Sequence, residues 1–361
     1  MHNNLIEPDL AILVGVGVNQ ILDANDLDEL ASLCETCNIQ TVGWVIQNRK
    51  DIDVTYYIGA GKVDEITALI QQTNANVVVF DVELSGSKVR NLEKAWGVPV
   101  LDRSKVILDI FAARARSAEG KLQVELAQLR YNLPRLTGAN GVMSKMRNGV
   151  GMRGPGEKKL ELDKRLIRDE IAALEKKLAA AKKVRVIGKN QRSSQRRVCL
   201  VGYTNSGKST LFNLITKADV YAKDELFATL DTTTRAVYLD GKNFVLTDTV
   251  GFINKLPHEF IRAFESTLDE TREADLFLHV IDCSNPEWEK QVAVVNRVLA
   301  NLGVGDTKQI MVYNKSDKNP QFVVPDDGVL ISAKNKVGID ELKACIYELI
   351  WIKLIFGPLW F

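Results

Sequence analysis

The first hundred residues alternate short apolar runs with longer segments of helical spacing. The apolar runs are "LAILVGV", "VVVFDV" and "VPVLD", and the helical segments are "LDELASLCETC", "GKVDEITALIQQT" and "KVRNLEKAWG". Strands that alternate with helices of this length are typical of a small parallel sheet. The pattern therefore predicts an N-terminal α/β subdomain over residues 1–103.

A helical region follows, interrupted by glycines and prolines. The spacing predicts continuous helix from Ser104 to about Leu136, a loop over residues 137–156 and then a second helix. In that second helix apolar residues occupy heptad positions, namely Leu160, Ile167, Ile171, Leu174, Leu178 and Ala181. Lys164 interrupts this seam. Residues 104–196 are thus predicted to form an antiparallel helix pair that ends in the polar linker "VIGKNQRSSQRR".

Strand-like runs return in residues 197–352. The segments "VCLVG", "IMVYN" and "VLIS" are apolar and short, and polar motifs follow each of them directly. This pattern predicts a second α/β domain with a mostly parallel sheet. Residues 353–361 are expected to form an apolar tail.

The formal net charge of +1 hides an uneven distribution. From Ala139 to Arg197 there are 17 Lys and Arg against 6 Asp and Glu, an excess of 11, so the rest of the chain carries −10 (1 − 11). Such a segment is either a solvated helix face or a contact with nucleic acid. We prefer the solvated face for Lys176, Lys177, Lys182 and Lys183, and contact with nucleic acid for the arginines of the glycine-rich loop. The five scattered cysteines, the absence of a leader at the N-terminus and the absence of an apolar run of ~18 residues favour a soluble cytoplasmic protein.

The segment "VCLVGYTNSGKSTLFNLI" combines a strand, a glycine loop and a helix. The pattern G-x-x-x-x-G-K-S lets backbone N–H groups converge on phosphates, which the helix N-terminus also attracts. Lys208 is expected to reach the β- and γ-phosphates, and Ser209 to ligate Mg²⁺. The predicted nucleotide contacts here are Gly202, Tyr203, Thr204, Asn205, Ser206, Gly207, Lys208, Ser209 and Thr210.

Two further motifs indicate which base is bound. "IMVYNKSD" ends a strand with Asn314, Lys315 and Asp317, and an Asp carboxylate can accept both N–H donors of guanine, a pair that adenine lacks. "VLISAKNKVG" places Ser332, Ala333 and Lys334 after another strand, where the Ala333 N–H is expected to meet guanine O6. Ligands of parallel sheets bind at the carboxyl ends of strands, so these motifs are expected to meet at one site that binds GTP and GDP.

The segment "TDTVGFIN" has the pattern Asp-x-x-Gly. Asp248 is expected to hold Mg²⁺ through water, and the Gly251 N–H to contact the γ-phosphate. The preceding segment "LDTTTR" offers a hydroxyl to Mg²⁺: Thr233 is preferred, with Thr232 and Thr234 as rivals. Phe252 stands where a water-orienting glutamine would be expected, so hydrolysis should be slow without an activator.

These motifs resemble those of the HflX family, ribosome-associated GTPases of the translation-factor-like class of P-loop proteins. The matching stretches include "YYIGAGKVDEI", "LDIFAARARSAEGKLQVELAQLRYNLPRLTG", "GMRGPGEKKLELDKR", "LFATLDTTTR" and "DTVGFINKLPHEFIRAFESTLDE". HflX proteins are similar in carrying an apolar residue after the Asp-x-x-Gly glycine. The family usually has glycine in place of Ala60 and proline in place of Thr232.

The resemblance implies a monomeric GTPase that binds the large ribosomal subunit in its GTP state and splits stalled or stressed ribosomes. The helix pair and its loop would reach the ribosomal RNA, with Arg147, Arg153, Lys158 and Lys159 as the expected RNA contacts. Lys208, Asn205 and Gly251 are the expected catalytic residues. Similar potassium-dependent GTPases use an asparagine at the position of Asn205 to bind K⁺, although loop conformation alone is an equal explanation for this residue.

Three other functions compete with this one. A metabolic P-loop kinase or ATPase is disfavoured by the guanine-reading motifs. A GTPase regulator with a membrane-linked or other non-ribosomal partner is suggested by the apolar terminus, which is too short to span a bilayer. A nucleotide-binding scaffold without turnover is disfavoured by Lys208, Ser209 and Asp248.

Overall fold

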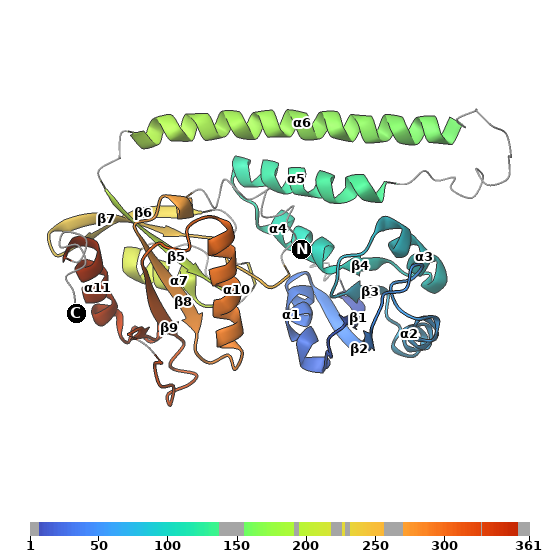
Figure 1. Cartoon of the computed structure of the whole chain (residues 1–361), viewed down its shortest axis with the longest axis horizontal. Coiled ribbons are helices and arrows are strands. Elements are labelled where there is room, and N and C mark those ends of the chain that lie inside the picture. Colours follow the sequence, from blue (N-terminus) through green and yellow to red (C-terminus); the bar gives the residue numbers. More distant parts are fainter. Residues whose placement is uncertain are drawn as a thin grey trace, which may run out of the picture. The chain divides into compact units, whose positions relative to one another are not determined.

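The computed structural model describes residues 7–136, 155–190, 195–217, 226–227, 232–255, 270–325 and 327–352 (Figure 1). At residues 155–159, 182–190 and 352 only the backbone is described. The chain divides into two compact units, the first of residues 1–113 and 124–178 and the second of residues 114–123 and 179–361. Each unit is described by itself below.

The first unit contains a parallel sheet of four strands in the order β2-β1-β3-β4 (Figure 1). The strands are β1 (Asp9–Val18), β2 (Ile39–Arg49), β3 (Val77–Phe80) and β4 (Val100–Asp102). The helices between them are a 3₁₀ turn (Ala24–Leu27), α1 (Asp28–Thr36), α2 (Ala60–Thr73) and α3 (Gly86–Trp96). The core includes Ile12, Val78 and Phe80, which are fully buried. The predicted α/β fold of this region is confirmed.

The helical region consists of α4 (Arg103–Arg114), α5 (Ala118–Asn132), a 3₁₀ turn (Leu133–Arg135) and α6 (Pro155–Asn190). The prediction of one continuous helix up to Leu136 is wrong, because the helix breaks after Arg114. Ser117 starts a new helix there, since its Oγ accepts a hydrogen bond from Gly120 N at 2.8 Å, as a helix-capping residue does.

The second helix starts close to the predicted bound of about residue 156, but its predicted end is wrong. Its first residue is Pro155, inside the predicted loop; proline suits the first position of a helix because its missing N–H is not needed there. The helix then continues to Asn190 through residues expected to be linker. Residues 137–154, the remainder of the predicted loop, lie outside the described residues.

The predicted heptad seam is visible in the burial of α6. Between residues 160 and 181, the positions that are not fully exposed are Leu160, Asp163, Lys164, Ile167, Ile171, Leu174, Leu178 and Ala181. All of these except Asp163 belong to the predicted seam. Within the first unit α5 and α6 lie side by side in opposite directions (Figure 1), and Arg130 of α5 pairs with Glu175 of α6 at 2.6 Å.

The second unit contains a six-stranded sheet in the order β10-β9-β8-β5-β7-β6. Its strands are β5 (Arg196–Gly202), β6 (Thr233–Leu239), β7 (Lys242–Asp248), β8 (Leu276–Asp282), β9 (Gln309–Asn314) and β10 (Val329–Leu330). Its helices include α7 (Lys208–Thr216), α10 (Trp288–Asn301), α11 (Ile339–Tyr347) and a π-helical turn (Glu348–Ile352). Only β6 and β7 pair antiparallel among the described strands. The predicted mostly parallel sheet is confirmed, and its carboxyl edge collects the polar motifs.

Candidate nucleotide-binding site

The glycine loop joins the end of β5 to the start of α7. Gly202 and Gly207 have positive φ angles of 151° and 94°. A Cβ added at Gly202 would lie 2.3 Å from Val280 O, and one at Gly207 would lie 2.2 Å from Asn314 Nδ2. Both positions therefore require glycine, because the neighbouring strands approach the loop too closely for any side chain.

Lys208 is buried at the first position of α7. Its Nζ donates to Tyr203 O at 2.7 Å and to Gly202 O at 3.2 Å, which uses two of the three donors of an ammonium group. Burial lowers the pKa of Lys208 to about 8, and the nearby Asp248 carboxylate partly opposes this shift. An anionic ligand at this nitrogen would stabilise its charged form.

The middle of the loop combines an unusual backbone with buried hydroxyls. Asn205 has a φ of 59°, in the left-handed region that asparagine tolerates better than most residues, as the explanation from loop conformation requires. Among the residues that the structure describes, the buried hydroxyls of Thr204 and Ser206 have no hydrogen-bond partner. Buried polar groups are rarely left so, and a phosphate ligand would supply acceptors. Ser209 is half-buried and Thr210 exposed on the first turn of α7.

Asn314, at the end of β9, links two of the predicted motifs. Its Nδ2 donates to Ser206 O at 2.9 Å, and its Oδ1 accepts from Ala333 N at 3.0 Å. The glycine loop and the Ser-Ala-Lys segment are thus held together by one side chain. The Ala333 N–H, expected to meet guanine O6, is already engaged by Asn314.

Asp317 is oriented by Ser332, whose hydroxyl donates to Asp317 Oδ1 at 2.5 Å. This hydrogen bond holds the pKa of the Asp317 carboxyl below its usual value. The residue is half-buried and lies on the loop beyond β9. Lys334 is exposed.

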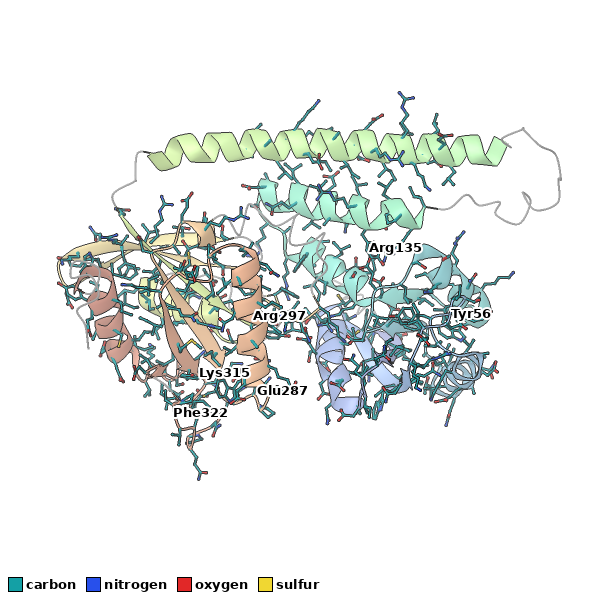
Figure 2. The ribbon with its side chains drawn as sticks, in the orientation of Figure 1. Tyr56, Arg135, Glu287, Arg297, Lys315 and Phe322 are labelled. Atoms are coloured by element: carbon teal, nitrogen blue, oxygen red, sulfur yellow. The ribbon has the colours of Figure 1, made fainter. Side chains whose placement is uncertain are left out.

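Lys315 has a left-handed φ of 66°, and its Nζ pairs with Asp282 Oδ2 at 2.9 Å. Asp282 ends β8. The rings of Tyr313 and Phe322 pack together with centroids 5.2 Å apart. Figure 2 shows Lys315 and Phe322 in the same region of the second unit.

The Asp-x-x-Gly segment is joined to the glycine loop. Asp248 ends β7 and is fully buried. A Cβ added at Gly251 would lie 2.8 Å from Thr204 Cα and 3.0 Å from Lys208 Nζ, so Gly251 borders the lysine directly. Phe252 N donates to Gly202 O at 3.1 Å, and Thr204 N donates to Phe252 O at 2.7 Å. The Phe252 side chain is only 3% exposed.

The strand register separates two of the three candidate threonines. Thr233 of β6 lies opposite Asp248 of β7, and Thr234 lies opposite Thr247. Residues directly opposite each other in an antiparallel pair share a face of the sheet. The Thr234 hydroxyl lies 3.1 Å from Thr247 Oγ1 and donates to Glu270 Oε2 at 3.0 Å, away from the face of Asp248.

Sequence reasoning missed two contributions. Asp282, the partner of Lys315, could have been suspected because it also ends a strand. The Tyr203 hydroxyl accepts a hydrogen bond from Asn254 N at 2.7 Å, which no pattern indicates. Of the expected RNA contacts, Arg147 and Arg153 lie outside the described residues, and Lys158 and Lys159 lie on α6 with only their backbone described.

Three family models match successive parts of the chain. They are described as "GTP-binding GTPase N-terminal" (residues 24–112), "GTP-binding GTPase Middle Region" (residues 114–192) and "50S ribosome-binding GTPase" (residues 197–315). A solved structure entitled "crystal structure of SsGBP and GDP complex" is similar over 94% of this chain and 98% of that chain, with a TM-score of 0.51 and 24% identity. At this identity the likeness supports the fold alone.

Curated relatives are much closer in sequence. The GTPase HflX of Caldanaerobacter subterraneus subsp. tengcongensis is 47% identical over 346 residues, covering 94% of this chain and 80% of the relative. The GTPase HflX of Escherichia coli strain K12 is 42% identical over 349 residues, covering 94% of this chain and 82% of the relative. With its glycine loop, its Asn-Lys-x-Asp and Ser-Ala-Lys segments and its Asp-x-x-Gly segment gathered at one sheet edge, this chain belongs to the HflX family of GTP-hydrolysing P-loop proteins.

Proposed function

We propose that this GTPase binds the large ribosomal subunit in its GTP state, dissociates stalled or stressed ribosomes, and leaves them after hydrolysis. The observation that carries the proposal is the match of residues 197–315 to the 50S ribosome-binding GTPase model, in a chain that is HflX-like almost throughout. A cytoplasmic location and action as a monomer are part of the proposal. Among the described residues, no helix has both the length and the apolar character needed to cross a membrane.

The nucleotide would lie along the carboxyl edge of the six-stranded sheet. Lys208 would bind the β- and γ-phosphates with its third donor, and the Gly251 N–H would contact the γ-phosphate. Asp317, oriented by Ser332, would accept the two N–H donors of guanine. The half-buried position of this carboxylate leaves it accessible to the base.

The oxygen donors next to this site fit Mg²⁺, which prefers hard oxygen ligands. Ser209, Thr233 and Asp248 would hold it, Asp248 through water. Thr233 is favoured over Thr234 because it shares a face with Asp248, whereas the Thr234 hydroxyl is bonded to Thr247 and Glu270. The ion would neutralise charge on the phosphates.

Activation of hydrolysis must come from a source other than residue 252. Phe252 is buried and offers no polar group to a water molecule. We propose that the ribosome orders the loops around the attacking water. K⁺ bound near Asn205 would add positive charge, although the left-handed backbone already explains this asparagine.

The experiment is GTP hydrolysis by the purified protein, with and without large ribosomal subunits, each in K⁺ and in Na⁺ at matched ionic strength. We expect the subunits to stimulate turnover by on the order of 10³-fold, as activators of slow GTPases do. A further requirement for K⁺ would assign that role to Asn205. Hydrolysis that the subunits leave unchanged in both salts would overturn the ribosomal proposal.

A set of charge variants tests the RNA contact. Replacing Arg147, Arg153, Lys158 and Lys159 with alanine should weaken binding to the subunits and reduce its dependence on salt. The matched control removes four charges from α6, those of Lys176, Lys177, Lys182 and Lys183, which are interpreted as a solvated helix face. Equal loss of binding in the two variants would argue against specific contact by the basic segment.

A further inference from the structure

The loop after the Asp-x-x-Gly glycine continues the pairing between β5 and β7. The regular ladder ends at Leu200 and Asp248, and the two bonds of Phe252 to Gly202 and Thr204 extend it across the glycine loop. Thr249 reinforces this junction, since its hydroxyl donates to Leu200 O at 2.6 Å. The backbone on both sides of Gly251 is thereby tied to the segment that carries Lys208.

A side chain adds one more tie beyond Phe252. Tyr203, the second residue of the glycine loop, is only 7% exposed, and its hydroxyl accepts the Asn254 N–H at 2.7 Å. Asn254 is three residues beyond Gly251 and leads into residues that the structure does not describe. The tyrosine therefore fixes the far end of the short segment that begins at Gly251.

The position of this segment matters for the γ-phosphate. The Cβ position of Gly251 is 3.0 Å from Lys208 Nζ, so a phosphate oxygen bound to that nitrogen would also border Gly251. A shift of the segment by about 1 Å would take the Gly251 N–H out of hydrogen-bonding range of a phosphate bound there, because such bonds weaken quickly with distance and angle.

We propose that the Tyr203 hydroxyl is a positioning group for GTP hydrolysis. It anchors Asn254 to the glycine loop and so holds the Gly251 N–H beside Lys208, where the γ-phosphate binds. The ring of Tyr203 is buried, and its hydroxyl is the acceptor for Asn254 N. This inference rests on the GTPase activity of the chain and does not depend on a ribosomal partner.

The test is Tyr203→Phe, which removes the hydroxyl and keeps the ring. Single-turnover hydrolysis of GTP without ribosomes should slow by about fivefold, the size expected for one lost hydrogen bond, while the Kd for GDP stays unchanged. In hydrogen–deuterium exchange the Asn254 amide should exchange faster. Tyr238→Phe is the matched control, because it deletes the same atom from a residue of the same unit that is 72% exposed.

Two results would overturn the proposal. Faster exchange at Asn254 with unchanged hydrolysis would show that the bond exists and positions nothing. A parallel loss of hydrolysis and of GDP affinity would show that the hydroxyl supports the fold of the glycine loop as a whole. Absence of hydrolysis in the unmodified protein would instead challenge the GTPase activity itself.

Discussion

Phe252 is a buried apolar side chain at the position where a polar one would be needed for water activation. A glutamine placed there would either bury an unpaired amide, at a cost of about 1–3 kcal/mol, or leave its pocket and disturb the bonds to Gly202 and Thr204. We therefore predict that Phe252→Gln does not raise basal GTP hydrolysis to the rate of an activated GTPase and that it lowers the free energy of unfolding. Phe252→Leu is the control, since it keeps the pocket apolar. A basal rate raised by on the order of 10³-fold would contradict this prediction.

His279 makes the stability of the second unit depend on pH. Burial lowers the pKa of its imidazole from 6.5 to about 4, and the neighbouring Lys208 contributes in the same direction, whereas a hydrogen bond with Gln309 opposes the shift. The unfolded chain therefore binds the proton first. As the pH falls from 6.5 towards 4, the free energy of unfolding should decrease, by up to about 3 kcal/mol.

Urea unfolding across this window, for the unmodified protein and for His279→Leu, measures this effect. The variant should show a flatter dependence on pH whatever its absolute stability. His2 and His258 remain in both proteins, so they cancel in the comparison. Parallel pH profiles for the two proteins would exclude His279 as the source.

Most residues around the nucleotide site belong to motifs that can be recognised in the sequence from the spacing of their residues. The spacing of Gly202, Gly207 and Lys208 along the sequence is fixed, because a tight turn, a close strand and a helix N-terminus meet at this loop. Tyr203 and Asp282 carry no such signal. Their contacts with Asn254 and Lys315 depend on where the fold brings distant segments together.

At the scale of elements, the junction between α5 and the first sheet depends on one buried carboxylate. Asp102, at the end of β4, accepts hydrogen bonds from Tyr131 Oη at 2.8 Å, Arg135 Nη2 at 3.0 Å and Leu84 N at 3.1 Å. It is fully buried. Burial, followed by the charge of Asp102, raises the pKa of the Tyr131 hydroxyl, which therefore remains a donor.

We predict that Asp102→Ala lowers the free energy of unfolding by about 3–5 kcal/mol, because it leaves the Tyr131 hydroxyl without its acceptor and removes the buried carboxylate that pairs with Arg135, whose other ion pair, with Glu83, is exposed. Chemical denaturation measures the change. Asp109→Ala is the control: Asp109 pairs with Lys105 on α4, but its side chain is 40% exposed, so its loss should cost no more than about 1 kcal/mol. Equal effects of the two substitutions would contradict this account.

The element types could be predicted better than their ends. The heptad residues of α6 predicted which face is covered, because the period of a helix determines its faces. The break before α5 depends on the single capping bond of Ser117, and α6 continues to Asn190 through Gly188, although glycine is a common signal for the end of a helix. Local composition is a weak guide at such positions.

At the scale of the whole molecule, charge and length are distributed unevenly. The excess of 11 positive charges between Ala139 and Arg197 falls mainly on α6 and the residues that flank it, whereas the remainder of the chain is acidic. A polyanion would therefore attract this segment of the chain and repel the acidic remainder.

The length of α6 has a consequence of its own. Its 36 residues span about 54 Å, and the backbone hydrogen bonds of a helix make that span inextensible. The helix therefore fixes the distance between Pro155 and Asn190. Removing one heptad would shorten the helix by about 10 Å and nearly preserve the direction of its apolar face, whereas removing two residues would rotate that face by about 160°, away from α5. The length of α6 and the direction of its apolar face can therefore be changed independently. A partner that requires a particular length would distinguish variants that differ by whole heptads.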